Sequence, residues 1–440
     1  AARTSLTDEP RLITLPPDDA ATTASGLALF NASDPLWALS SASGGAARPL
    51  YVIAVECVSG LDLNSGAVDP HALPAAVTVT FAHPKRGHFT GQGIEVTGAL
   101  LVADIGVPTD LAAHLTTELA MAPDVAAHLP LRPRHAHKGT FGRALIVAGS
   151  VYYTGAAALA ACAAQRAGAG LVTLGVPRPL QGILAATLYE ATWLPLPHDL
   201  GVLAADAARL LNEKLGQYQA LLIGPGLSTE KETGAFLKAF FQPEEPKARS
   251  RPQIGFVRAH GATPDDAPSE KHSSARTDLP PLVVDADALN WLATQENWPT
   301  LLPPDSILTP HPGEMARLCG LATADEVNRQ RWNLAIERAA AWNQVVLLKG
   351  PHTIVAAPDG RVRVMPFATS TLATAGTGDV LAGVIVALLA QGLQPFDAAV
   401  VGAYLHGLAG SLTAVDVARA GVVAGDVVAA LPQAWQMLAN

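Results

Sequence analysis

Residues 374–390 have the sequence TAGTGDVLAGVIVALLA, a glycine-rich turn that runs directly into an apolar helix. Gly376 and Gly378 lack a Cβ atom, so the backbone there can approach a ligand closely. The free N–H groups and the dipole of the following helix favour an anion, most simply a nucleotide phosphate. Asp379 would repel that anion unless it has a task, such as accepting the proton of a substrate hydroxyl during phosphoryl transfer. The alternative is that Asp379 only caps the helix and the glycines only form a turn.

The composition limits the class of protein. The chain has 440 residues, 49% hydrophobic and 15% charged, which suits two or three domains with ordinary cores. A net charge of −9 argues against a general nucleic-acid binder, and three widely spaced cysteines argue against a disulfide scaffold or zinc site. No membrane span or signal peptide stands out, although the missing initial Met leaves open that residues precede Ala1. We expect a cytoplasmic protein without nucleic-acid or membrane partners.

From residue 142 onward, apolar strands alternate with segments typical of helices. An antiparallel hairpin is expected over residues 353–365, around a turn at 358–360. This alternation predicts an α/β fold, a mostly parallel sheet with helices on both faces, in which ligands bind beyond the carboxyl ends of the strands. The strands are expected at 142–149, 170–176, 220–224, 282–287, 306–309 and 344–350.

The N-terminal part is organised differently, as a partial Rossmann-like α/β segment with little crossover helix. Its strands are expected at 51–56, 76–81 and 98–104, whereas residues 1–48 have no clear pattern. Prolines and histidines concentrated in residues 122–138 mark a boundary, which predicts domains at 1–125 and 126–440. Residues 242–280 are charged and rich in proline, which predicts a disordered surface insertion in the second domain.

Four further motifs follow predicted strands and could share a crevice with the glycine-rich turn. The sequence GPGL at 224–227 allows close backbone approach to a ligand. Asp285 and Asp287 would point the same way if their strand continues, and could then organise Mg²⁺ or else cap the next helix. His311 is restrained by two flanking prolines and is either a ligand contact or a structural residue. Lys349 either meets a phosphate or extends to solvent.

Together these motifs carry a resemblance. From residue 138 to the C-terminus the chain resembles the NAD(P)H-hydrate dehydratase family, a branch of the ribokinase-like fold. The motifs are KGTFGRALIVAGS (138–150), YTGAAALAA (153–161), QRAGAGLVTL (165–174), LLIGPGL (221–227), VVDADALN (283–290), LTPHPGEMARL (308–318), VVLLKGPHTIV (345–355), LATAGTGDVLAG (372–383) and YLHGLAG (404–410).

The resemblance implies repair of a reduced nicotinamide ring that has taken up water. The ring hydroxyl of the hydrate would be phosphorylated from a nucleotide, ADP or ATP, with Mg²⁺ assisting, and phosphate would then be expelled to restore NADH or NADPH. Nothing in the residues chooses between the two nucleotides, although bacterial chains of this kind look ADP-dependent, acting on the S-form of the hydrate. We also expect a homo-oligomer.

The family's site residues map onto this sequence by motif. Asp379 would take the hydroxyl proton and reach both ligands. Gly376, Thr377 and Gly378 would hold the transferring phosphoryl group. The nucleotide would be bound by the segment Lys349, Gly350, Pro351, His352 and Thr353, and the hydrate pocket would be lined by Ala156, Gly226 and His311.

The N-terminal part resembles the second half of the NAD(P)H-hydrate epimerase domain, the usual fusion partner. The similarity lies in VIAVECVSGLD (52–62), TVTFAHPK (78–85) and VADIGVP (102–108). Glu56 replaces the family's Asp before the turn at Ser59, and Val58 replaces its Pro. The motif NNGGDG is absent from the whole chain. These departures argue against K⁺ binding and epimerisation, so we predict a vestigial, truncated epimerase segment packed on the dehydratase.

Two other functions fit the same motifs. A ribokinase-fold small-molecule kinase, of the thiazole or pyrimidine type, would release a stable phosphorylated product rather than free phosphate. A non-catalytic nucleotide-binding protein is the second alternative. The intact GTGD at 376–379 argues against a non-catalytic protein, because a carboxylate beside phosphate would only weaken binding at a site that performs no catalysis.

Overall fold

The computed structural model describes residues 27–30, 51–243, 276 and 278–439. Its main feature is a ten-stranded sheet in the order β5-β16-β15-β14-β13-β12-β11-β6-β7-β8. The strands are β5 (Thr117–Leu119), β6 (Arg143–Val147), β7 (Leu171–Pro177), β8 (Thr192–Leu196), β11 (Ala220–Ile223), β12 (Leu282–Val284), β13 (Ile307–Leu308), β14 (Val345–Leu348), β15 (Ile354–Ala356) and β16 (Val362–Val364).

The sheet is mostly parallel, as the alternation of strands and helices predicted. Strands β8, β7, β6, β11, β12, β13 and β14 pair in parallel. The expected hairpin is confirmed, because β15 pairs antiparallel with both β14 and β16. A parallel sheet needs cover on both faces, since its strands carry apolar side chains on both sides. The strands of this chain satisfy that rule.

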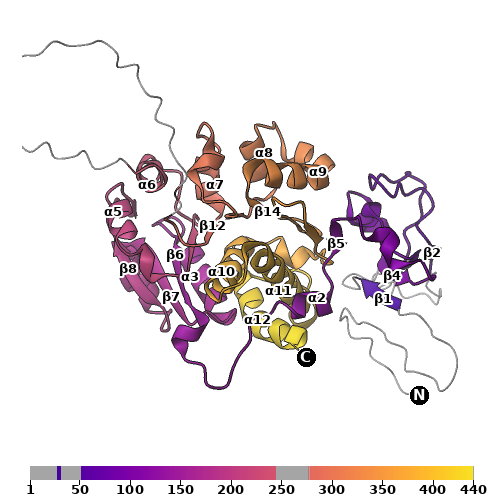
Figure 1. Cartoon of the computed structure of the whole chain (residues 1–440), viewed down its shortest axis with the longest axis horizontal. Coiled ribbons are helices and arrows are strands. Elements are labelled where there is room, and N and C mark those ends of the chain that lie inside the picture. Colours follow the sequence, from indigo (N-terminus) through magenta and orange to yellow (C-terminus); the bar gives the residue numbers. More distant parts are fainter. Residues whose placement is uncertain (1–26, 31–50, 244–275, 277, 440) are drawn as a thin grey trace, which may run out of the picture.

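Helices cover both faces of the sheet and create two cores (Figure 1). On β6, Ala144 and Ile146 face one core while Leu145 and Val147 face the other, which is the period-two alternation of a strand. The first core is closed by α3 (Thr154–Arg166), α4 (Arg178–Ala185), α10 (Thr377–Ala390), α11 (Pro395–Asp416) and α12 (Ala424–Ala439). The second is closed by α5 (Ala207–Asn212), α6 (Lys231–Phe241), α7 (Ala286–Leu292), α8 (Pro312–Cys319) and α9 (Ala324–Trp342).

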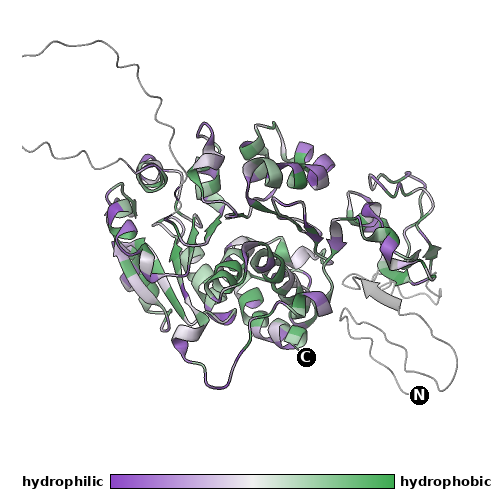
Figure 2. Ribbon diagram, in the orientation of Figure 1, coloured by the Kyte–Doolittle hydropathy of each residue, from purple (hydrophilic) through white to green (hydrophobic). Residues whose placement is uncertain are grey.

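Helices α10 and α11 lie in the middle of the first core and are the most apolar helices around it (Figure 2). By length and composition alone α11 could cross a membrane, which the sequence pattern did not suggest. However, 89% of its most apolar window is buried inside the protein, as is usual for a central helix of a large core. The burial of these helices places the start of α10 in the interior, beneath the ends of the strands.

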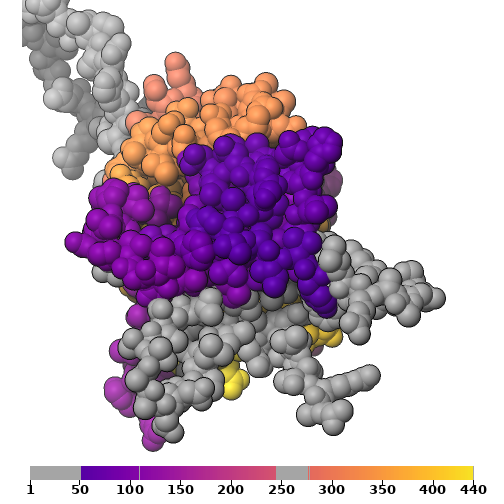
Figure 3. Space-filling view, turned by 90° about the vertical axis from the view of Figure 1, so that its right-hand side faces the viewer, coloured from indigo at the N-terminus to yellow at the C-terminus, as the bar shows by residue number. Residues whose placement is uncertain are grey.

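A smaller sheet of four strands, in the order β1-β4-β3-β2, lies in the N-terminal part. Strands β2 (Ile53–Val55), β3 (Val77–Phe81) and β4 (Ala99–Ala103) lie where strands were predicted and pair in parallel, and β1 (Leu27–Phe30) pairs antiparallel with β4. The short helix α1 (Gly93–Thr97) precedes β4. This part packs on the larger sheet's helices (Figure 3), and two of its side chains, Phe89 and Leu100, belong to the second core.

The predicted domain boundary at residue 125 falls shortly after a strand of the large sheet. Strand β5, which precedes the predicted boundary at residue 125, pairs with β16 of the large sheet. The helix α2 (Ala122–Ala126) follows it. Most of the predicted insertion at 242–280, and most of residues 1–48, lie outside the described residues.

Candidate functional site

The glycine-rich turn does lead into a helix. Gly376 precedes α10 with φ of 90°, a backbone conformation that strongly favours glycine. A Cβ atom on Gly376 would lie 2.6 Å from Leu159 Cδ1, so the position also has no room for a side chain. The Thr377 hydroxyl donates to the carbonyls of Leu372 (2.8 Å) and Thr374 (2.9 Å) and so fastens the turn. The first N–H groups of α10 have no intrahelical acceptor and are available to an anion.

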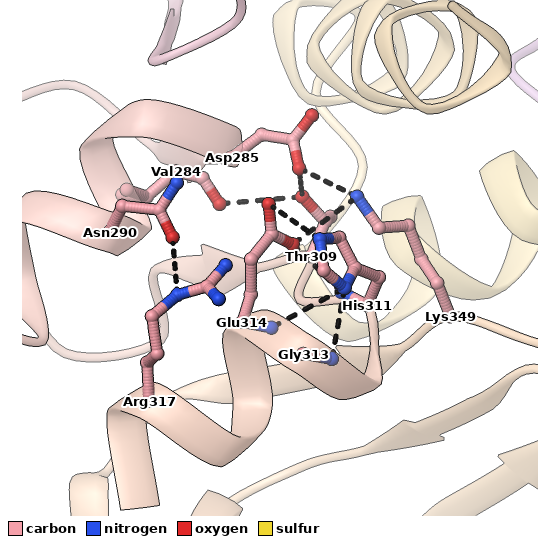
Figure 4. Close-up of polar contacts among 9 residues, drawn as sticks. All are labelled: Val284, Asp285, Asn290, Thr309, His311, Gly313, Glu314, Arg317 and Lys349. Carbon is pink, nitrogen blue, oxygen red and sulfur yellow. Dashed lines mark hydrogen bonds and ion pairs between the residues drawn. The ribbon is translucent and has the colours of Figure 1, made fainter. Parts of the chain in front are cut away.

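Lys349 brings a cation to that helix start. It follows β14, and a Cβ atom built on Gly378 would lie only 3.4 Å from its Nζ. The ammonium donates to Asp285 Oδ1 at 2.9 Å and lies 3.7 Å from Glu314 Oε2 (Figure 4). Burial alone would lower the pKa of Lys349, but the carboxylates of Asp285 and Glu314 outweigh it and raise that pKa. Lys349 is therefore a permanent positive charge beside the start of α10.

Asp379, two residues into α10, is half-buried beside this cluster. Burial, followed by repulsion from Asp285, raises the pKa of Asp379 to about 7, although Lys349 acts in the opposite direction. A carboxyl group with a pKa near neutrality can both take and return a proton under ordinary conditions. The structure thus gives Asp379 a charge environment suited to proton transfer, which is more than a helix cap requires.

The prediction for Asp285 and Asp287 needs a correction. The strand does not continue past Val284, because Ala286 adopts φ of 50° and the chain turns into α7. The two carboxylates therefore have different partners. Asp285, 1% exposed, accepts from the Thr309 hydroxyl at 2.8 Å and from Lys349, whereas Asp287 accepts from the Ser228 N–H at 2.8 Å. Asp285 caps α7 by its position in the backbone but without a side-chain hydrogen bond.

His311 caps α8 with its ring. The ring Nδ1 accepts from the backbone N–H groups of Gly313 (2.9 Å) and Glu314 (3.3 Å). The backbone N–H of His311 in turn donates to Glu314 Oε2 at 2.8 Å. An accepting Nδ1 requires the proton of the neutral ring to be on Nε2. Burial, Lys349 and Arg317 lower the pKa of His311 and keep the ring neutral. The side chain is 50% exposed, and its Nε2 lies 3.5 Å from Glu314 Oε1.

Ala156 and Gly226, from distant parts of the chain, lie side by side. Gly226 has φ of 63°, and a Cβ atom there would lie 2.8 Å from both Ala156 Cβ and Tyr153 Cβ. The small residues thus allow the GPGL turn to meet the start of α3. Tyr153 itself is 55% exposed, which leaves an aromatic ring at the surface beside this contact.

A cavity of about 610 Å³ opens between the predicted nucleotide segment and the start of α10. Its walls include Lys349, Gly350, Pro351 and Thr353 on one side and Thr377 and Gly378 on the other. Ala156, Gly226 and His311 do not line it. His352 also points elsewhere: its Nδ1 lies 3.0 Å from the Met365 carbonyl, and its ring packs edge-on against Phe89 with centroids 4.9 Å apart.

Sequence reasoning did not single out three residues of this region. Glu314 is buried, and burial raises its pKa while Lys349 opposes the shift. Arg331 is buried behind Gly350. His406 of α11 lines the cavity, is 8% exposed, and has no partner for Nε2 among the described residues. Burial lowers the pKa of His406 to about 4, so its ring is neutral. The motif YLHGLAG contained that histidine but gave no sign of its direction.

The carboxylates here do not form a ready-made metal cage. Among the described residues, no three His, Cys, Asp or Glu side chains are grouped closely enough to hold an ion. Asp285 and Glu314 are both paired with Lys349. Mg²⁺ in nucleotide sites is commonly held by one or two carboxylates together with substrate phosphates, and the donor set fits that mode of binding.

Comparisons with known proteins identify the family of this chain. A family model for NAD(P)H-hydrate dehydratase matches residues 144–248 and 267–433. The bifunctional NAD(P)H-hydrate repair enzyme Nnr of Moorella thermoacetica is 42% identical over 383 residues, covering 86% of this chain and 66% of the relative. The chain thus spans about two thirds of the length of such relatives.

Solved structures show the same fold. An ADP/ATP-dependent NAD(P)H-hydrate dehydratase from Bacillus subtilis, co-crystallised with ATP and Mg²⁺, aligns with a TM-score of 0.57 and 28% identity, covering 73% of this chain and 98% of that one. A ribokinase-like superfamily protein from Enterococcus faecalis, 22% identical, aligns with a TM-score of 0.56 over 74% of this chain and 97% of that one. The chain has the ribokinase-like fold and belongs to the NAD(P)H-hydrate dehydratase family.

Proposed function

We propose that this chain dehydrates the S-form of hydrated NADH and NADPH, with ADP as the phosphoryl donor and ATP as a possible substitute. The observation that carries the proposal is Asp379, whose pKa of about 7 arises beside the Lys349 cation at the start of α10. A base poised near neutrality next to a phosphate-binding helix end is what transfer of a phosphoryl group to a weakly acidic hydroxyl requires. Family membership supports the same assignment.

The residues divide the work as follows. The turn at 376–378 and Lys349 hold the phosphates, and Gly350, Pro351 and Thr353 form the wall of the nucleotide cavity. Ala156, Gly226 and His311 line the hydrate pocket, where the exposed ring of Tyr153 offers an apolar surface to the nicotinamide. His352 supports the segment from inside rather than touching the nucleotide.

The proposed reaction has two stages, phosphorylation of the ring hydroxyl and elimination of phosphate. Asp379 takes the proton of the ring's hydroxyl group as the oxygen of that hydroxyl attacks phosphorus. The bond from phosphorus to the nucleotide oxygen then breaks. The ring nitrogen then donates its lone pair, the carbon–oxygen bond breaks with phosphate leaving, and the departing phosphate takes a proton from the neighbouring carbon, which restores the double bond. Lys349 and the helix end stabilise negative charge on the transferring group throughout. When bound, Mg²⁺ would neutralise phosphate charge, and Asp379 and Asp285, whose carboxylates both act on the charge of Lys349, would hold it.

The N-terminal part has a different role in this proposal. The Glu56 carboxylate accepts from the Phe81 N–H at 2.9 Å and pairs with the Lys85 ammonium. Lys85 also donates to the Thr80 hydroxyl and the Phe81 carbonyl, each at 2.9 Å. An ammonium that already neutralises Glu56 competes with any K⁺ ion at that carboxylate. We therefore propose that this part is a vestigial, structural epimerase segment.

The test is conversion of hydrated NADH and NADPH by the purified chain with Mg²⁺ and either ADP or ATP. The expected result is recovery of reduced-nicotinamide absorbance with one equivalent of inorganic phosphate per turnover, and its loss in Asp379→Asn. A stable phosphorylated product without phosphate release would identify a small-molecule kinase instead. Nucleotide binding without turnover on either hydrate would overturn the dehydratase proposal and leave the small-molecule kinase and the non-catalytic protein as the alternatives.

A further inference from the structure

The nucleotide cavity has a wall that the dehydratase fold does not supply. Besides the segment at 349–353 and the start of α10, its lining includes three N-terminal residues, Ile94, Glu95 and Gly98. Ile94 and Glu95 belong to α1, more than 250 residues away in sequence from Lys349. The Bacillus subtilis dehydratase aligns over 98% of its own length with only 73% of this chain. The α1 wall is therefore an addition to a fold that is complete without it.

The turn that precedes α1 is fastened to α9. Trp332 Nε1 donates to the Thr90 hydroxyl at 2.7 Å, in a bond buried from solvent. The Arg86 guanidinium lies over the Trp332 ring, 5.1 Å from its centroid, and donates to Asn333 Oδ1 at 3.0 Å. These contacts combine a buried aromatic ring with hydrogen bonds from Trp332 and Arg86, which makes the junction specific rather than merely apolar.

The same turn also touches the nucleotide segment directly. Phe89, 6% exposed, packs edge-on against the His352 ring with centroids 4.9 Å apart. His352 is the residue between Pro351 and Thr353, which both line the cavity. Phe89 is four residues before Gly93, where α1 begins. The position of α1 is therefore coupled to the position of the nucleotide segment through a buried ring contact.

The chemistry of the α1 wall suits the nucleoside end of a nucleotide and not its phosphate end. Phosphates belong beside Lys349, Thr377 and Gly378, where a cation and free N–H groups are available. Glu95 is an exposed carboxylate that repels phosphate but accepts hydrogen bonds from hydroxyl and amino groups. Ile94 is half-buried and offers apolar surface. Sugar hydroxyls and a flat amino-substituted base are the donor and apolar groups of a nucleoside.

We infer that the vestigial N-terminal segment completes the nucleotide site, with Ile94 and Glu95 forming the wall at the nucleoside end and Glu95 accepting a hydrogen bond from the nucleoside. The inference rests on the proposed function for the identity of the ligand, and it deepens that function by naming the residues that select the nucleoside. Arg419, near the C-terminal end of the chain, also lines the cavity and contributes a positive charge to it. The carboxylate of Glu95 thus sets the direction in which a nucleotide enters.

The experiment compares Glu95→Ala and Glu95→Gln with wild type in the whole chain, measuring Kd for ADP by isothermal titration calorimetry with Mg²⁺. Asp69→Ala is the matched control, an exposed acid of the same segment that does not line the cavity. Glu95→Ala should raise the Kd about tenfold, equivalent to about 1.4 kcal/mol. Glu95→Gln keeps an acceptor oxygen and should therefore lose less ADP affinity than Glu95→Ala does.

Two ADP analogues identify the donor. If the base amine donates, inosine diphosphate should bind wild type more weakly than ADP does, and Glu95→Ala should abolish that difference. If the ribose donates, 2′-deoxy-ADP should behave in this way. Equal ADP affinity in Glu95→Ala and wild type would overturn the inference and leave the proposed function standing. Conversely, Glu95-dependent binding of ADP by a chain that converts no hydrate would overturn the proposed function alone.

Discussion

The Lys349 ammonium donates a 2.9 Å hydrogen bond to Asp285 Oδ1 while lying close to Gly378, at the start of α10. One cation therefore neutralises a carboxylate that is 1% exposed and also places positive charge beside the start of a helix, where we propose that phosphate binds. A buried charge that loses its partner is strongly destabilising, because nothing else compensates its desolvation. Stability and function are consequently linked at this position.

Replacing Lys349 by Met should destabilise the chain by about 3 kcal/mol, since Asp285 would be left as a buried, unpaired carboxylate. Urea unfolding measures the change, provided that the slope of the transition is unaltered. The double variant Lys349→Met with Asp285→Asn should recover most of the stability and none of the turnover. Equal instability of the single and double variants would show that the pair does not interact as described.

Asp379 should impose a pH dependence on turnover. The carboxylate form is the proton acceptor, so the rate should rise as pH increases through about 7, the pKa of Asp379. The charged groups that surround it are Lys349, Asp285, Asp287 and Glu314. Asp285→Asn removes a repelling charge and should move the profile to lower pH. A rate that is flat between pH 6 and pH 8 in wild type would exclude Asp379 as the base.

Ionisation of the same carboxyl group should lower the stability of the fold as pH rises, although it raises the rate of turnover. Its folded-state pKa of about 7 lies above the ordinary aspartate value, so the folded state holds a proton that the unfolded state has lost between those values. Stability therefore falls as pH rises toward 7, and the cost is fully present above it. Asp379→Asn should raise Tm at pH 8 by about 2 °C and have no such effect at pH 4. Calorimetric scans at the two pH values make the comparison.

His406 should matter for the nucleotide and not for folding. Its neutral ring is 8% exposed, lines the cavity, and has no described partner for Nε2. An unsatisfied buried polar atom costs about 1 to 3 kcal/mol, so a ligand that pairs with it gains affinity. His406→Leu should leave stability within about 1 kcal/mol and raise the Kd for ADP several-fold. A loss of stability with unchanged affinity would make His406 a core residue only.

Gly376 tests the shape of the phosphate turn. Its φ of 90° and the 2.6 Å approach of Leu159 Cδ1 leave no room for a methyl group. Gly376→Ala should cost at least about 1 kcal/mol of stability and most of the turnover, because the helix start must shift. Adding Leu159→Ala relieves the steric contact but not the backbone strain, so only part of the stability should return. Full recovery in the double variant would assign the whole effect to crowding.

Much of this architecture can be predicted from local sequence. The apolar strands, the small-residue helix α3 and the turn before α10 each follow from the residues in one stretch, since period and turn chemistry act over a few positions. The prediction failed at Asp285 and Asp287. The run VVDADALN fits a longer strand and a strand followed by a helix equally well, and Ala286 adopts a left-handed conformation that its own residue type does not favour.

The chain's own sequence was sufficient to predict the α/β class, the glycine-rich turn that leads into a helix at 376–379 and Asp379 as the candidate base, because these depend on neighbouring residues. Only the tertiary structure brings Lys349 to Asp285, Phe89 to His352 and α1 to the nucleotide cavity. Those contacts join residues separated by 64 or more positions, and no local pattern specifies which distant partner will lie across a buried surface. The charge on Asp379 is decided there too, since burial and the surrounding carboxylates set its pKa.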